Sequence, residues 1–175
     1  FYFVIIFLLY LIIKSVIFYI INKRKPIVFL AKFSKDNLYW HLLSLTLAAY
    51  SVFVILYSYN KLGILFQSLI IDAIGFILLI LGFIIVIISH AQMGKSWRMG
   101  NDYESKSKLV DIGLFSYSRN PVYLGIIICG FALLLLIPNI IFLILFIVLV
   151  LIINLVINSE EKFLEKQFGD EYIQY

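Results

Sequence analysis

Two polar stretches of an otherwise apolar sequence, 93–123 and 160–175, carry the side chains that could do chemistry. Arg119 lies in the first stretch, and its planar guanidinium group can bind a carboxylate of a cofactor or substrate through two charge-assisted hydrogen bonds. The second stretch contains the adjacent Glu160 and Glu161. A glutamate that faces inward could accept hydrogen bonds from a ribose diol or an ammonium group. The two stretches therefore predict a site for a polar ligand.

Tyrosines add to this set, because Tyr123, Tyr172 and Tyr175 offer aromatic faces with polar tips. Structural interpretations exist beside the functional one. Arg119 could anchor the inner membrane face, Trp97 could belong to an interfacial aromatic belt, and the two glutamates could stabilise the start of a helix through its dipole. For the set taken together, we favour a functional site.

These stretches must be positioned by membrane helices. The 175 residues are 63% hydrophobic and 14% charged, with a mean hydropathy of +1.06. In a soluble domain about a quarter of the residues are charged, because its surface must contact water. The composition therefore predicts an all-α integral membrane protein and excludes a disordered chain, a disulfide scaffold and a free cytosolic enzyme.

Five membrane helices are expected. Apolar segments at 1–21, 38–59 and 64–89 each have about the 20 residues that cross a bilayer, and the first is expected to be a helix rather than a signal peptide. The link 60–63 predicts an antiparallel pair of helices. The last apolar run, 122–157, is too long for one span, and Pro138 and Asn139 near its middle predict a short helical hairpin. Residues 158–175 are expected to form a C-terminal helix, with Asn158 as its N-terminal cap and Gly169 at its end.

Basic residues predict the orientation of these helices, since short loops rich in Lys and Arg stay in the cytoplasm. Lys61 is expected on the outer face, and the segments 22–37, 91–121 and 158–175 on the inner one. The net charge of +4 is thus explained by basic residues that orient the helices in the membrane, and it does not indicate nucleic-acid binding. The inner face receives twelve of the fourteen basic residues, namely Lys23, Arg24, Lys25, Lys32, Lys35, Lys95, Arg98, Lys106, Lys108, Arg119, Lys162 and Lys166.

The sequence gives little support for a metal site or for a functional ion pair inside the membrane. His41 and His90 lack a partner at ligand spacing, and Cys129 is the single cysteine, so no metal is expected. Lys14 and Asp72 could form a pair inside the membrane, but we favour a snorkelling lysine and an aspartate near the outer end of its helix.

The ordered motifs resemble those of the isoprenylcysteine carboxyl methyltransferases, in a wider grouping of membrane methyltransferases that includes the phospholipid N-methyltransferases. The resemblance covers about the C-terminal half, so it divides the chain into three N-terminal helices (1–90, with the basic loop 22–37) and a methyltransferase-like part (91–175). That part consists of the loop 91–121, the hairpin 122–157 and the helix 158–175. The motif residues are Leu109, Val110, Gly113, Arg119, Asn120, Pro121, Tyr123, Glu160, Glu161, Phe168, Gly169, Tyr172 and Tyr175.

The resemblance implies an S-adenosylmethionine-dependent methyltransferase whose cofactor pocket faces the cytoplasm and whose lipid substrate approaches from the bilayer. It implies catalytic roles for Arg119 and Glu161. Asn120 stands where the family usually has histidine, which changes the hydrogen bonding there. The implied cofactor-binding residues are Leu109, Val110, Gly113, Arg119, Asn120, Pro121, Tyr123, Glu160, Glu161, Tyr172 and Tyr175.

Direct methyl transfer from a sulfonium needs alignment and desolvation more than an activated nucleophile. A glycine-rich nucleotide turn is absent, because no two glycines stand two residues apart. Three functions remain open: O-methylation of an isoprenylcysteine-like or other hydrophobic acid, which we favour; N-methylation of a phospholipid amine; and a non-catalytic protein that keeps the fold. The residue usage (Ile, Phe, Lys, Asn) is typical of an AT-rich microbial genome, so a microbial cell membrane is expected.

Overall fold

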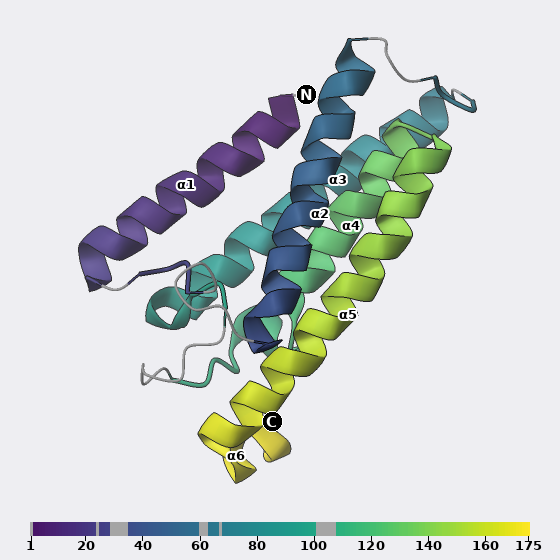
Figure 1. Cartoon of the computed structure of the whole chain (residues 1–175). Helices are drawn as coiled ribbons and strands as arrows, with labels where there is room; N and C mark the ends of the chain where they lie inside the picture. The colour runs from purple at the N-terminus through teal and green to yellow at the C-terminus, as the bar shows by residue number, and fades with distance from the viewer. Residues whose placement is uncertain (1, 24, 29–34, 60–62, 67, 101–107) are drawn as a thin grey trace.

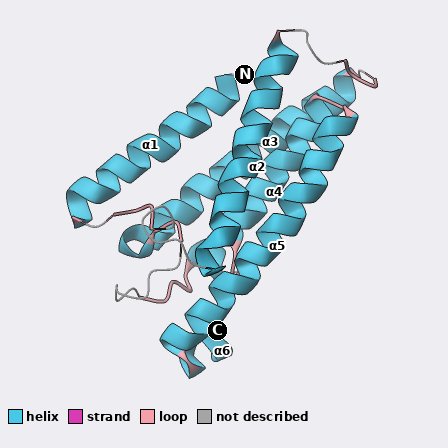
Figure 2. Cartoon of the chain, in the orientation of Figure 1, coloured by secondary structure: helices cyan, strands magenta, loops and turns pink. Residues whose placement is uncertain are grey.

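The computed structural model describes all residues except 1, 24, 29–34, 60–62, 67 and 101–107, and leaves out the side chains of 35 and 36. Throughout the described part every regular element is a helix (Figure 2). This confirms the predicted all-α fold. Ile27 and Met99 form an isolated β-bridge. The elements are α1 (Tyr2–Asn22), α2 (Lys35–Ser58), α3 (Leu69–Met93), the 3₁₀ turns η1 (Gly94–Ser96) and η2 (Gly113–Ser116), α4 (Pro121–Leu136), α5 (Ile140–Phe168) and α6 (Asp170–Gln174).

Four of these helices, α1, α2, α3 and α5, are long and apolar enough to cross a membrane. Helix α4 has 16 residues and is about 24 Å long, which is less than the ~30 Å of a hydrocarbon core. The predicted break at Pro138 is confirmed, because α4 ends at Leu136 and α5 begins at Ile140. Asn139 caps α5, since its Oδ1 accepts a hydrogen bond from the Ile141 amide at 2.8 Å. The protein is a multi-pass membrane protein.

Helices α2 to α5 pack side by side, whereas α1 stands apart from them (Figure 1). Within α1, Phe18 is the one buried residue. Long aromatic side chains bridge the space to α3: the rings of Phe3, Phe7 and Tyr10 lie 5.5, 5.9 and 5.7 Å from the ring of Phe83. Helix α1 is therefore held by the tips of side chains and not by close contact between backbones.

Helices α3 and α4, in contrast, cross at the distance of backbone contact. A Cβ atom added to Gly82 would lie 2.8 Å from the carbonyl oxygen of Gly125, and one added to Gly125 would lie 2.8 Å from the carbonyl oxygen of Gly82. Small residues commonly allow this approach between membrane helices. The contact is important for function because α4 carries Pro121 and Tyr123, both of which are buried.

Two local predictions are wrong. Helix α3 begins at Leu69 rather than at residue 64, so the connection from α2 is longer than the predicted link 60–63, of which 60–62 lie outside the described residues. Asn158 caps nothing, because α5 runs through it without a break to Phe168. Gly169 does end the helix as expected, with a φ of +57° that favours glycine.

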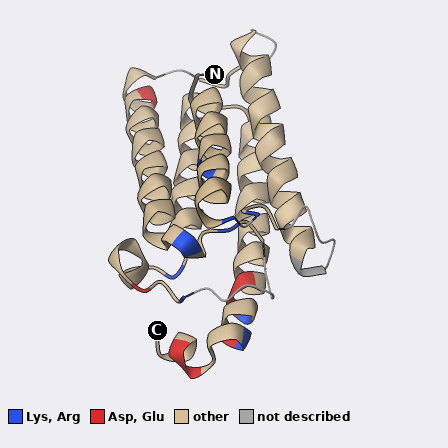
Figure 3. Ribbon diagram, turned by 90° about the vertical axis from the view of Figure 1, so that its left-hand side faces the viewer, with Lys and Arg blue, Asp and Glu red and all other residues tan. Residues whose placement is uncertain are grey.

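Most of the charged residues that the structure describes lie at the end of the bundle where the C-terminus lies (Figure 3). Lys14 and Asp72 do not form a pair: Asp72 lies in the first turn of α3, whereas the Lys14 Nζ donates to the carbonyl of His90, near the other end of α3, at 3.4 Å. A cation is favourable there because it faces the negative end of the helix dipole. Arg24, Lys32, Lys61 and Lys106, which entered the orientation argument, lie outside the described residues.

Candidate active site

A cavity of about 610 Å³ extends between α1, α2, α3 and α4 and reaches the tail of α5 with α6. Phe7 and Leu11 of α1, with Leu43 and Leu47 of α2, line part of it. The other end is formed by the segments around the two polar stretches of the sequence. The cavity therefore joins an apolar chamber among the helices to a polar end beside the tail.

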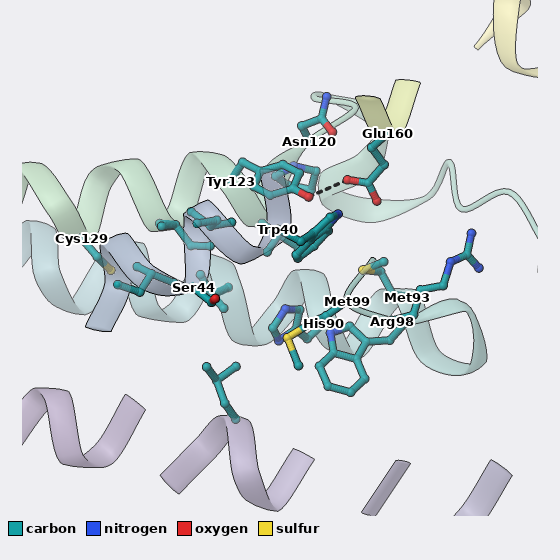
Figure 4. Close-up of a pocket in the computed structure, with 18 of the residues that line it drawn as sticks. Trp40, Ser44, His90, Met93, Arg98, Met99, Asn120, Tyr123, Cys129 and Glu160 are labelled. Carbon is teal, nitrogen blue, oxygen red and sulfur yellow. Dashed lines mark hydrogen bonds between the residues drawn. The ribbon is translucent and has the colours of Figure 1, made fainter. Parts of the chain in front are cut away.

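The polar end contains a hydrogen-bonded pair. The Tyr123 hydroxyl donates to Oε2 of Glu160 at 2.6 Å, and Figure 4 shows the two side chains pointing toward each other from α4 and α5. Tyr123 is 5% exposed. The ring of Trp40 lies 6.2 Å from the Tyr123 ring. Because Tyr123 orients it, the Glu160 carboxylate lines the cavity in a defined position.

Glu161, the next residue on α5, has a different environment. Its Oε1 accepts a hydrogen bond of 3.4 Å from Nδ2 of Asn120, and it does not line the cavity. Successive residues on a helix point about 100° apart, so Glu160 and Glu161 face different directions. The Asn120–Glu161 contact instead ties the start of α4 to α5.

Arg119 lies at the cavity mouth against two tyrosines. Its guanidinium carbon is 5.2 Å from the ring centre of Tyr172 and 5.8 Å from that of Tyr175. Gly169 makes this possible, because its turn folds α6 back and buries Tyr172. Burial raises the pKa of Tyr172 to about 12, so at neutral pH its hydroxyl is protonated. Burial also raises the pKa of Tyr175, whose hydroxyl donates to the carbonyl of Phe115.

Pro121 explains why Arg119 and Asn120 stand at this mouth. Proline suits the first position of a helix, and it keeps the preceding residue out of the helical conformation. Asn120 accordingly has φ −131° and ψ 53°, outside the helical region, and α4 begins at Pro121. Arg119 is thereby held just outside the helix, in the wall of the cavity.

Two further cations, Arg98 and Lys108, line the same end. The guanidinium of Arg98 lies 5.1 Å from the Phe163 ring centre, and its Nη2 is 3.4 Å from Oε1 of Gln167. Lys108 is exposed, and its carbonyl accepts a hydrogen bond from Ser96. Among the described residues that line it, the polar end thus combines one carboxylate with three positive charges.

The comparisons with known proteins identify the family. The profile of the family described as phospholipid methyltransferase matches residues 70–171, which is more than half of the chain. The chain belongs to the phospholipid methyltransferase family. No curated protein and no solved structure matches it significantly. The protein is therefore a membrane methyltransferase, and its family implies S-adenosylmethionine as the methyl donor.

The match confirms the predicted membrane methyltransferase grouping and leaves the methyl acceptor open. Of the predicted cofactor-binding residues of this methyltransferase, all except Gly113 and Glu161 line the cavity. Gly113 has a φ of +64°, and an added Cβ atom would lie 2.1 Å from Nε2 of Gln92. Gln92 Oε1 also accepts the amide of Leu114 at 2.9 Å, so Gly113 shapes a turn. The nine that line the cavity are Leu109, Val110, Arg119, Asn120, Pro121, Tyr123, Glu160, Tyr172 and Tyr175.

The structural alternative for Trp97, a place in an interfacial aromatic belt, is wrong. Trp97 is 1% exposed and lines the cavity of the methyltransferase. Its ring meets those of Phe18 and His90 edge-on, at 5.5 and 5.3 Å. The His90 Nδ1 is also hydrogen-bonded to the Tyr10 hydroxyl at 3.0 Å. Trp97 and His90 therefore link α1 to the wall of the cavity.

Sequence reasoning missed the contribution of α2 to the site. Trp40, Ser44, Ala48 and Ser51 line the cavity from one face of this helix. Their spacing of three or four residues is the period of a helix, and the small size of the last three is the signal that could have indicated a lined space. In the part of the chain that is described, no group of His, Cys, Asp and Glu is arranged to hold a metal ion.

Proposed function

We propose that this methyltransferase N-methylates the amine of a zwitterionic glycerophospholipid, and that Glu160 rather than Glu161 serves the chemistry. The observation that carries the proposal is the Glu160 carboxylate, which lines the cavity at the end that also holds Arg98, Lys108 and Arg119. A phospholipid amine headgroup has an ammonium and a phosphate. A site with a carboxylate and separate cations complements both of these charges, whereas a simple acid substrate would need only cations.

The residues present fit the methyl donor. S-adenosylmethionine has an α-carboxylate, an ammonium, a ribose and an adenine base, and it supplies a methyl group on a positively charged sulfur. Arg119 would hold the α-carboxylate through its planar fork. The rings of Tyr172 and Tyr175 would give the base an aromatic surface. The cavity of about 610 Å³ lies within the range of sites for small molecules and cofactors.

Amine methylation also requires the removal of a proton. An ammonium has no lone pair, so it cannot attack a methyl group until it has lost a proton. Glu160 would accept this proton from the bound headgroup, and Tyr123 would keep the carboxylate oriented through its 2.6 Å hydrogen bond. The nitrogen lone pair would then form the new N–C bond as the bond between the methyl group and sulfur breaks.

O-methylation of a hydrophobic acid is the second candidate, and Arg119 favours it. Its guanidinium group lines the cavity and could bind the carboxylate of the acceptor instead of that of the donor. A carboxylate is already ionised at neutral pH, so this reaction would need no proton acceptor. Under this alternative Glu160 would hold the ribose or the ammonium of the donor.

We further propose that the polar end of the cavity faces the cytoplasm of a microbial cell. The support is the cluster of Lys and Arg at this end of the bundle (Figure 3), because basic residues in short loops remain on the cytoplasmic side. Residues 91–175 would then supply most of the donor site, and 1–90 the walls of the apolar chamber.

Arg119→Lys should weaken the binding of S-adenosylmethionine about tenfold, which corresponds to about 1.4 kcal/mol. Lysine keeps the charge but lacks the fork that binds a carboxylate through two hydrogen bonds. The measurement is calorimetry on the purified protein in detergent, with the unfolding temperature as a check on folding. Arg119→Gln, which removes the charge as well, should bind still more weakly. Unchanged affinity in both variants would remove Arg119 from the donor site.

The acceptor can be identified by methyl transfer from radiolabelled donor. Phosphatidylethanolamine in mixed micelles should be methylated, whereas a farnesylcysteine analogue should give label no higher than a reaction without acceptor. Transfer to farnesylcysteine alone would establish the second candidate. A protein that neither binds the donor in calorimetry nor transfers label would be a non-catalytic member of the family.

A further inference from the structure

The apolar part of the cavity contains a polar group that the proposed chemistry does not use, the hydroxyl of Tyr50. Tyr50 belongs to α2, lines the cavity and is 4% exposed. Its hydroxyl oxygen is buried and has no hydrogen-bond partner among the described residues. A buried donor without a partner destabilises a protein, so such a group usually has a structural or functional reason.

The surroundings of Tyr50 hold this hydroxyl in place. The Tyr50 ring packs edge-on against Phe142, with ring centres 5.9 Å apart. A Cβ atom added to Gly130 would lie 3.5 Å from the Tyr50 hydroxyl oxygen and 2.7 Å from a methyl carbon of Leu149. The hydroxyl therefore lies over a glycine of α4, where a larger residue would occupy the space. Gly130 itself lines the cavity.

The depth of the hydroxyl can be estimated from helix geometry. Gly130 follows Tyr123 by seven residues in α4, or about 10 Å of rise, and Leu149 precedes Glu160 by eleven residues in α5, or about 16 Å. The hydroxyl thus lies roughly 10–16 Å from the Tyr123–Glu160 pair along the bundle. Figure 4 shows Cys129, the neighbour of Gly130, at the end of the cavity away from Glu160 and Arg98.

This separation matches one feature of a diacyl glycerophospholipid. From the headgroup nitrogen to an ester carbonyl oxygen there are roughly ten bonds, which span about 12 Å when extended. A prenylated cysteine, in contrast, has only hydrocarbon beyond its sulfur, close to the carboxylate. A lipid whose nitrogen reaches Glu160 would place an ester carbonyl at the depth of Tyr50, and the phenol could donate to it.

We propose that Tyr50 is a specificity-determining residue, whose hydroxyl donates a hydrogen bond to an ester carbonyl of the acceptor lipid. The inference rests on the proposed function, because it places the headgroup nitrogen at Glu160. It goes further in selecting ester-linked over ether-linked lipids. With such a lipid bound, the buried hydroxyl gains a hydrogen-bond partner. The lipid is then held at two places, at its headgroup by Glu160 and at its ester by Tyr50.

The test is a competition between two lipids with the same headgroup. Wild-type protein is equilibrated with equal amounts of dioleoyl phosphatidylethanolamine and its dialkyl ether counterpart in detergent, and the lipid retained after gel filtration is measured by mass spectrometry. The wild type should be enriched about fivefold in the diester, equivalent to roughly 1 kcal/mol, which is the size of a net hydrogen bond. Tyr50→Phe, which removes only the hydroxyl, should retain the two lipids equally.

Tyr57→Phe is the matched control, because Tyr57 lies on the same helix, is half-buried and does not line the cavity. It should keep the wild-type preference. Equal retention of both lipids by the wild type, or an unchanged preference in Tyr50→Phe, would overturn the Tyr50 contact. Methyl transfer to both phosphatidylethanolamines is measured in parallel. If the proposed N-methylation is wrong, neither lipid will be labelled, and this result is independent of the retention measurement.

Discussion

Glu160→Gln should lower methyl transfer to phosphatidylethanolamine about 100-fold at neutral pH, as expected for the loss of a general base. Glutamine has the size of glutamate and can still accept the hydrogen bond of the Tyr123 hydroxyl, so the fold should be retained. It cannot take a proton from the headgroup ammonium. The measurement is the turnover number at saturating donor, with donor affinity determined by calorimetry on the same preparation.

The two measurements separate the possible roles of Glu160. If the carboxylate accepts the proton, turnover falls while donor affinity stays unchanged, and raising the pH restores part of the rate because more of the amine is already neutral. If the carboxylate instead binds the ribose of the donor, donor affinity falls and raising the pH has no such effect. That second outcome would contradict the proton-acceptor role.

Two neighbouring glutamates serve as controls for Glu160→Gln. Glu165→Gln changes an exposed glutamate of the same helix that does not line the cavity, and its turnover should equal that of the wild type. Glu161→Gln should change turnover less than about threefold, because it alters a 3.4 Å contact with Asn120 and leaves the carboxylate that lines the cavity in place. A larger loss in Glu161→Gln than in Glu160→Gln would restore the catalytic role that the family resemblance implied for Glu161.

Gly125→Leu should destabilise the protein by about 3 kcal/mol, at the upper end of what overpacking a tight contact costs. Even a Cβ atom at this position would lie 2.8 Å from the Gly82 carbonyl oxygen and 2.8 Å from a methyl carbon of Val86. The backbone of α3 cannot rotate away as a side chain can, so α3 and α4 must separate. The measurement is thermal unfolding in detergent, with the yield of folded protein as a second readout.

Gly125→Ala should give an intermediate loss of stability. Gly63→Ala is the matched control, because an added Cβ atom there meets nothing within 4 Å and should leave the unfolding temperature unchanged. Since α4 carries Tyr123, any Gly125 variant that still folds should also lose turnover. Full stability in Gly125→Leu would show that the close crossing of α3 and α4 is not required.

Hydropathy predicted the helices well because a membrane helix must be apolar along its whole length. The same signal misplaced the start of α3, since Ile64, Leu65 and Phe66 are apolar but lie before the helix, which begins at Leu69. Asn158 failed as a cap for a related reason. Its residue type suits a helix start, but a cap forms only where a helix is interrupted, and α5 continues through it.

The candidate site was predictable where consecutive motifs meet and unpredictable where distant helices contribute. Arg119 and Pro121 were found from the sequence because proline determines where a helix begins. The sequence could not show which of Glu160 and Glu161 lines the cavity, since this depends on the rotation of α5 about its axis. The role of Tyr50 depends on the packing of α2 against α4 and α5, which no local pattern records.

The short length of α4 has a consequence for the surrounding lipid. A helix about 6 Å shorter than the hydrocarbon core creates a hydrophobic mismatch, which costs fractions of a kcal/mol per Å if the bilayer must thin to meet it. The segment before α3 removes this need, because the Leu65 amide donates to the carbonyl of Pro138 at 2.8 Å and Asn139 donates to that of Gly63. It thereby covers the turn between α4 and α5 and exposes Leu65 and Phe66. These side chains extend the apolar height above α4, so the bilayer can keep its ordinary thickness around a helix too short to span it.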